Sequence, residues 1–258
     1  MRGEPCLALE SVTKRFGGVK AVGGEVGLNL VVQRGSFLGL IGPNGAGKST
    51  TFDLISGVQK PTSGKVVFEG HLLSSTRPSG IAALGIGRTF QKPRAFPSLS
   101  IVDNVVVGPD NVGEHLGRAL AGGWRDGDRR FHARAIELLE RVGLGDRLSS
   151  PVSTLSGGEL RMLEVARQLV REPTLLLLDE PTAGVDPGLQ KRLGELLAEL
   201  HGEGVTLIVV EHNLHFLLGL ADRIAVLHRG ELLAEGTPEE IRTDQRVISA
   251  YLGTDLAA

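Results

Sequence analysis

Cysteine, aromatic side chains and long apolar runs are all scarce in this sequence. The single cysteine, Cys6, cannot form an internal disulfide, which fits a reducing compartment such as the cytosol. Even with glycine counted, no apolar run exceeds the eight residues of 80–87, whereas a membrane-spanning helix needs about 20. The N-terminus also lacks the apolar stretch of a signal peptide. We therefore expect a soluble chain in the cytoplasm, and any contact with a membrane must go through another protein.

An excess of charge of either sign is missing as well. The net charge is −2 with 22% charged residues, so the chain lacks the basic field that nucleic-acid-binding proteins usually carry, and we expect no nucleic-acid partner. A chain of 258 residues that is 41% hydrophobic buries a sizeable core. Because aromatic residues make up only 4%, that core must consist mainly of Leu, Val, Ile and Ala.

Three continuous apolar runs, at residues 35–42, 174–181 and 205–212, indicate strands. Strands buried on both faces are typically apolar throughout, so we predict an α/β fold with a mainly parallel sheet covered by helices. Functional groups in such folds lie at the carboxyl ends of the strands. Residues 107–128 are glycine-rich and expected to be irregular, whereas residues 129–144 carry apolar side chains at helical spacing.

The run at 35–42 leads directly into a GxxxxGK(S/T) motif between an expected strand and an expected helix. Its glycines let backbone N–H groups turn toward phosphate oxygens, and the following helix adds its positive dipole end. Lys48 would reach the terminal phosphates, and Ser49 would offer a hydroxyl to Mg²⁺. The alternative is a glycine-rich turn that happens to precede Lys-Ser. The residues assigned to nucleotide binding here are Gly42, Pro43, Asn44, Gly45, Ala46, Gly47, Lys48, Ser49 and Thr50.

The run at 174–181 ends in two adjacent acids, Asp179 and Glu180. Asp179 would hold Mg²⁺, and Glu180 would orient and polarise the attacking water. Because adjacent residues on a strand point to opposite faces, we expect the two acids to have different roles. The alternative is a strand that ends in a solvated acidic turn.

The segment LSGGE begins a third motif. Ser156 followed by Glu159 forms a capping box ahead of an apolar helix face, and a well-capped helix is the plain interpretation. Yet Gly157 and Gly158 each weaken a helix by roughly 1 kcal/mol relative to alanine. They are explained if an anion must approach the bare backbone.

In this order, the phosphate loop, LSGG, the paired acids and a strand that ends in histidine resemble the ATPase subunits of ABC transporters. The resemblance covers essentially the whole chain. It implies one ABC ATPase domain over residues 1–258: a P-loop core with a mainly parallel sheet, a small antiparallel β subdomain and a helical subdomain inserted at about 92–168. It also implies that Ser156, Gly157 and Gly158 grip the γ-phosphate of ATP held by a second ATPase subunit.

The resemblance assigns four further residues. Phe16 lies where the family has an aromatic that stacks on adenine, the alternative being a buried phenylalanine at a strand end. Gln91 matches the loop that touches Mg²⁺ and senses the membrane partner. Asp186, in the sequence AGVD, matches the loop that crosses the dimer interface. His212 matches the histidine that contacts the γ-phosphate. One position departs from the family pattern, because Glu159 stands where glutamine is usual.

Two stretches are similar to one branch of the family, the ATPases of branched-chain amino-acid importers: residues 85–105, which contain RTFQ, and residues 211–253, which end in YLG. Importers of urea or short amides share these features, as do lipopolysaccharide exporters less closely. An ABC ATPase outside transport is a further alternative, although such proteins usually carry two cassettes or a long coiled coil.

The branch implies ATP and Mg²⁺ as cofactors, with Ser49, Asp179 and Gln91 around the metal. It implies a homo- or heterodimer of ATPase subunits, transmembrane permease subunits, indirectly a substrate-binding protein, and a peripheral position on the cytoplasmic face of the membrane. We further expect four bulky residues after the RTFQ segment to line a groove for a permease helix, or else to join the helical subdomain's own core. They are Phe90, Pro93, Arg94 and Phe96.

Overall fold

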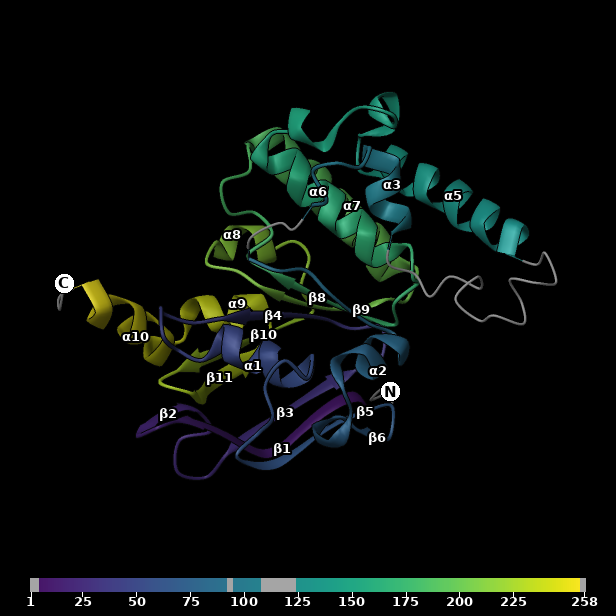
Figure 1. Ribbon diagram of the computed structural model, residues 1–258. Helices are drawn as coiled ribbons and strands as arrows, with labels where there is room; N and C mark the ends of the chain where they lie inside the picture. Colours follow the sequence, from purple (N-terminus) through teal and green to yellow (C-terminus); the bar gives the residue numbers. More distant parts are fainter. Residues whose placement is uncertain (1–4, 92–94, 108–123, 256–258) are drawn as a thin grey trace. The chain divides into compact units, whose positions relative to one another are not determined.

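The computed structural model describes residues 5–91, 95–107 and 124–255 of the chain. It divides into two compact units, which we describe separately (Figure 1). The core unit comprises residues 1–88, 174–181 and 197–258, and the helical unit comprises residues 89–173 and 182–196. The insertion expected at about 92–168 stays a prediction.

The strands all belong to the core unit: β1 (Pro5–Phe16), β2 (Val19–Val22), β3 (Leu28–Gln33), β4 (Phe37–Ile41), β5 (Ser63–Phe68), β6 (His71–Leu72), β7 (Ile86–Arg88), β8 (Leu175–Asp179), β9 (Thr206–Val210), β10 (Arg223–His228) and β11 (Glu231–Gly236). The same unit contains α1 (Lys48–Ile55), η1 (Leu73–Ser75), α2 (Pro78–Ala83), α8 (Leu214–Leu217), α9 (Pro238–Thr243) and α10 (Gln245–Asp255). The helical unit contains α3 (Ile101–Val106), α5 (Trp124–Arg141), η3 (Gly145–Arg147), η4 (Val152–Thr154) and α6 (Gly157–Leu169), and α7 (Pro187–Gly202) runs from it into the core unit.

A six-stranded sheet in the order β11-β10-β4-β9-β8-β7 organises the core unit. All its pairings are parallel except that of β10 with β11. Every residue of β4, β8 and β9 is buried, as the continuous apolar runs predicted. Leu40 pairs with Val210, and Val210 pairs with Asp179, so the three strands end side by side at one edge.

A second sheet in the core unit is antiparallel, with the order β2-β1-β5-β6 and with β3 also paired to β1. Side chains from both sheets and from α1 share one hydrophobic cluster, in which Phe52 of α1 is fully buried. Figure 1 shows α1 lying between the two sheets. The helix that follows the phosphate loop is thus held on both sides, and the predicted P-loop α/β fold is confirmed.

In the helical unit, α3, α5 and α6 pack on one another. Their buried side chains are aliphatic, among them Val105, Leu138 and Leu163. The expectation that residues 107–128 are irregular is wrong at its end, because α5 begins at Trp124. Gly127 in the first turn of α5 destabilises the helix by roughly 1 kcal/mol relative to alanine, which does not prevent a helix of 18 residues. Among the described residues, no helix is long and apolar enough to cross a membrane.

Replacing Phe52 with alanine should lower the free energy of unfolding by about 3–5 kcal/mol, because it leaves a cavity between the two sheets. Urea unfolding monitored by circular dichroism measures this loss. The control is Phe96→Ala in the helical unit: Phe96 is 44% exposed, and its loss should cost under about 1 kcal/mol. Equal losses in the two variants would contradict the shared core.

Candidate functional site

The phosphate loop joins the end of β4 to the start of α1. Gly47 is the residue before the helix and has a φ of 99°, a left-handed conformation that glycine adopts without strain. Gly42 has a φ of 152°, and a Cβ at this position would lie 2.2 Å from the carbonyl oxygen of Leu227. Gly45 has a φ of 77° with open space beside it. Packing against β10 therefore requires glycine at 42, whereas at 45 the loop backbone is left accessible.

Lys48 folds back over this loop. Its buried Nζ donates hydrogen bonds to the carbonyl oxygens of Gly42, at 2.6 Å, and of Pro43, at 3.1 Å. Burial lowers the pKa of the Lys48 ammonium, and the negative charges of Glu180 and Asp179 oppose that shift. The cation thus keeps the loop curled and lies within electrostatic range of both acids. On the loop Asn44 is exposed and Ala46 is buried, and in the first turn of α1 Ser49 is exposed and Thr50 is half-buried.

Asp179 closes β8 and is buried. Its Oδ2 lies 3.9 Å from Nη2 of Arg88, whose Nη1 donates to Oδ1 of Asp53 at 2.7 Å and to Oγ of Ser56 at 2.6 Å. Arg88 therefore connects the acid at the end of β8 to α1. Sequence reasoning missed this residue, although an arginine at the end of a short apolar strand was a usable signal.

Glu180 lies just beyond β8, and its φ is 49°. The reasoning from strand alternation was wrong here, because Glu180 is not on the strand and its backbone is left-handed. Its Oε1 lies 2.8 Å from Nε2 of His212, which follows β9. A carboxylate accepts, so the imidazole N–H donates this bond. Both are predicted site residues, and the structure brings them into contact.

The side chains predicted to hold Mg²⁺ include two in the core unit, Asp179 and Ser49. A carboxylate and a hydroxyl are hard oxygen donors of the kind Mg²⁺ prefers, and a site with so few protein ligands suits a metal that is completed by phosphate and water. Within the described residues, no group of three or more His, Cys, Asp or Glu side chains gathers to hold a metal alone. The donor set therefore fits a nucleotide-bound Mg²⁺. Gln91 is exposed and belongs to the helical unit.

Phe16 ends β1 and is 46% exposed. The ammonium of Lys14 lies 4.9 Å from its ring centroid, a distance typical of a cation–π contact. The alternative of a buried strand-end phenylalanine is wrong, because the ring is open to solvent. Stacking on adenine stays a prediction.

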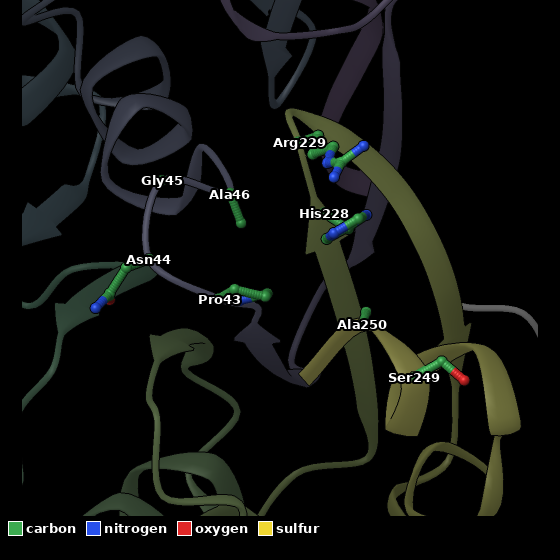
Figure 2. Close-up of a pocket in the computed structure, with 8 residues that line it drawn as sticks. All are labelled: Pro43, Asn44, Gly45, Ala46, His228, Arg229, Ser249 and Ala250. Carbon is green, nitrogen blue, oxygen red and sulfur yellow. The ribbon is translucent and has the colours of Figure 1, made fainter. Parts of the chain in front are cut away.

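A cavity of about 280 Å³ lies beside the tip of the phosphate loop. Figure 2 shows the loop on one side and the β10–β11 turn and α10 on the other. The side chain of Asn44 points away from the turn and from α10. The lining residues are Pro43, Asn44, Gly45, Ala46, His228, Arg229, Ser249 and Ala250. The C-terminal segment therefore shapes the surroundings of the loop.

In the helical unit, Ser156 caps α6 through the predicted capping box with Glu159. A Cβ on Gly158 would lie 2.9 Å from Cδ1 of Leu189, whereas a Cβ on Gly157 would meet nothing within 4 Å. Packing against Leu189 therefore adds a second reason for glycine at 158, whereas Gly157 has open space beside it. The approach of an anion to these two glycines stays a prediction. Asp186 precedes α7, and its Oδ1 accepts hydrogen bonds from the amides of Gly188 and Leu189, at 3.0 and 3.1 Å.

The residue before Gln91 is held by α6. The amide of Phe90 donates to Oε1 of Glu164 at 2.9 Å, and Nη1 of Arg161 donates to the Phe90 carbonyl oxygen at 2.9 Å. Glu164 is 3% exposed, and no sequence motif pointed to it. A charged residue on the buried face of an amphipathic helix was the available signal.

The expected permease groove is described only in part. Phe96 lies on the surface, with Arg167 5.2 Å from its ring centroid, and Phe90 is half-buried. Pro93 and Arg94 lie outside the described residues, so the groove stays a prediction.

Two family profiles match this chain. Residues 26–183 match the family described as ABC transporter. Residues 231–257 match the family described as branched-chain amino acid ATP-binding cassette transporter. The second match includes β11, α9 and α10, and α10 lines the cavity beside the phosphate loop.

Among curated proteins, the chain is similar to the probable branched-chain amino acid transport ATP-binding protein LivG of Archaeoglobus fulgidus, with 36% identity over 96% of this chain and 95% of that protein. It is 39% identical to the high-affinity branched-chain amino acid transport ATP-binding protein LivG of Escherichia coli K12, over 97% and 98% of the two chains.

Two solved structures show the same fold. One is a nucleotide-free ATP-binding cassette from an ABC transporter, with a TM-score of 0.83, 31% identity and coverage of 96% of this chain and 99% of that one. The other is the dimeric post-hydrolysis state of a cassette bound to ADP and Pi, with a TM-score of 0.74, 26% identity and coverage of 90% and 98%.

Replacing Glu164 with leucine should lower the free energy of unfolding by about 1–3 kcal/mol, because it removes the acceptor of the Phe90 amide. Glu164→Gln keeps a carbonyl acceptor and should lose less. Urea unfolding gives the stability, and hydrogen exchange gives the protection of residues 89–91. Met162→Leu, also on the buried side of α6, is the control; faster exchange in that variant but not in Glu164→Leu would contradict the contact.

Proposed function

The chain belongs to the ABC transporter family, and we propose that it is the ATP-hydrolysing subunit that powers uptake of branched-chain amino acids. The match of residues 231–257 to the branched-chain profile carries this choice of substrate, and the LivG relatives, which are similar over nearly their whole length, support it. The resemblance predicted from the motifs is confirmed at the level of the family. The relatives favour branched-chain amino acids over urea, amides or lipopolysaccharide, and a transport role over one outside transport.

In the proposed mechanism, residues 42–50 cradle the phosphates of ATP. The open backbone at Gly45 and the positive end of α1 receive phosphate oxygens. Lys48, already folded over the loop, exchanges its carbonyl partners for the terminal phosphates. Phe16 offers its exposed ring to adenine, and such stacking contributes about 1–3 kcal/mol.

Ser49 and Asp179 of the core unit would hold Mg²⁺, with Gln91 as a further ligand. When bound, this ion neutralises charge that develops on the phosphate oxygens. The ion pair with Arg88 holds the Asp179 carboxylate in position at the end of β8. Its bonds to α1 also fix the helix on which Ser49 lies.

Glu180 would take a proton from the attacking water, and His212 would contact the γ-phosphate. The hydrogen bond between their side chains fixes where the carboxylate points. The proposed base, Glu180, and the residue proposed to contact the γ-phosphate, His212, are therefore already in contact before ATP binds.

Two subunits would close over two ATP molecules. Ser156, Gly157 and Gly158 of one subunit would contact the γ-phosphate held by its partner, and Asp186 would lie at the interface between them. A solved cassette with the same fold is dimeric. Hydrolysis and loss of phosphate would remove the bridge between the two subunits, and the dimer would reopen.

As an ATP-binding subunit of a transporter, the chain works with membrane permease subunits. We propose that it lies on the cytoplasmic face of the membrane through them, with the groove near Phe90 and Phe96 as the docking surface. A substrate-binding protein would complete the importer and deliver the amino acid from the other side.

Glu180→Gln should bind Mg·ATP without hydrolysing it and should accumulate as a dimer on a sizing column. In this background, Lys48→Ala should abolish dimerisation, because it removes the cation that reaches the terminal phosphates. Gly157→Ala should weaken it while leaving stability unchanged within about 0.5 kcal/mol, because a Cβ there meets no atom of the chain.

The column is run with and without Mg·ATP, with the variant alone and mixed with a paralogous ATPase subunit from the same organism. Lys48→Ala is also made as a single substitution, for an assay of ATP hydrolysis. If Glu180→Gln stays monomeric in every mixture, or if the Lys48→Ala single variant hydrolyses ATP at the wild-type rate, the proposed mechanism is wrong.

A further inference from the structure

Glu159 poses an electrostatic problem that rests on the proposed function. It is the third residue of α6, one position beyond the glycines that would receive the partner's γ-phosphate. A carboxylate beside an incoming triphosphate repels it, and the repulsion is strong where water is excluded. The usual residue at this position, glutamine, carries no charge. Something in the chain must make the acid compatible with phosphate binding.

The Glu159 carboxylate is bound at both oxygens. Oε2 accepts the amide hydrogen of Ser156 at 2.7 Å, and Oε1 accepts Nη1–H of Arg147 at 2.7 Å. Both side chains are about one-third exposed or less, at 26% for Glu159 and 34% for Arg147. The pKa of the Glu159 carboxyl is lowered, chiefly by the hydrogen bond from the Ser156 amide and also by the charge and hydrogen bond of Arg147. The carboxyl is therefore ionised at neutral pH.

Arg147 is itself fixed from a second side. Its Nη2 donates to the carbonyl oxygen of Thr154 at 2.8 Å and lies 2.9 Å from the Thr154 hydroxyl. The guanidinium therefore spans from the segment before Ser156 to the first turn of α6. An arginine held in this planar arrangement keeps its charge in place at little further loss of freedom.

We propose that Arg147 is a charge-compensating residue for nucleotide binding: it neutralises Glu159 and holds that carboxylate against the Ser156 amide, so that the glycine backbone can receive an anionic phosphate. The role of Arg147 is to position and neutralise, and it makes no contact with the nucleotide. The arginine and the acid form one unit that replaces the neutral glutamine of the family pattern.

A purely structural role makes a different prediction. If Arg147 only stabilises the loop through Thr154, its loss causes the same defect whether residue 159 is glutamate or glutamine. If it compensates charge, its loss matters only while residue 159 carries a charge. The two roles are therefore separated by a second substitution at 159.

The test uses the Glu180→Gln protein and the ATP concentration that gives half-maximal dimerisation, measured by light scattering. Arg147→Met should raise this concentration about ten-fold, the scale of one nearby unit charge at a protein surface. Adding Glu159→Gln to Arg147→Met should restore the parent value within about two-fold, because no charge is left to compensate. Glu159→Gln alone should stay close to the parent, since its amide oxygen can still accept the Ser156 amide. The defect of Arg147→Met should shrink as salt rises from about 0.05 to 0.5 M.

The control is Arg134→Met, which removes an arginine paired with Glu137 on α5 of the same unit. It should leave dimerisation unchanged. If Arg147→Met does not fold, Arg147→Gln, which also removes the charge, replaces it in the series. Arg147→Lys is measured in addition; lysine keeps the charge and should dimerise within about three-fold of the parent.

A double variant that is as defective as Arg147→Met, or a defect that does not respond to salt, overturns the compensation. So does normal dimerisation of Arg147→Met at low salt, or loss of dimerisation in Arg147→Lys when the protein is folded. Failure of the Glu180→Gln parent to dimerise with Mg·ATP overturns the proposed function together with this inference, whereas the other outcomes overturn the inference alone.

Discussion

The chemistry of this protein depends on three parallel strands that end side by side. β4, β9 and β8 are neighbours in the sheet, and Leu40, Val210 and Asp179 lie in one register across it. The chain leaves each strand with a different group: a glycine loop after β4, two acids at the end of β8 and a histidine after β9. No local interaction assembles these groups. The buried sheet does so, because its parallel pairing brings the carboxyl ends of the three strands to one edge.

Three of the predicted functional residues of the helical unit lie in the turn that begins α6. Its functional turn is built from backbone, and side chains serve to expose or fix that backbone. Ser156 and Glu159 cap α6, Gly158 is small because Leu189 lies against it, and Glu164 with Arg161 holds both backbone groups of Phe90. One helix therefore fixes both the turn proposed to meet the partner's nucleotide and the residue that precedes Gln91.

Local sequence patterns predicted the features that depend on residues close together in the chain. The phosphate loop, the buried strands and the capping box each lie within a few residues, so spacing and composition suffice to find them. The bonds of Arg88 to Asp53 and of Phe90 to Glu164 join residues 35 and 74 positions apart. Such pairs depend on how elements pack, which no motif encodes. The start of α5 was misjudged because glycine lowers helix propensity without forbidding the helix.

The backbone at Glu180 has a consequence for how this fold evolves. A left-handed glutamate costs on the order of 1 kcal/mol relative to glycine, and the sheet holds it there through the bond from its amide to the Val210 carbonyl oxygen, at 2.9 Å. Selection for stability alone would favour glycine or asparagine at this position, because both adopt the left-handed conformation more readily than glutamate. A related chain that has lost its turnover should therefore show the change here early, while its buried strands remain intact.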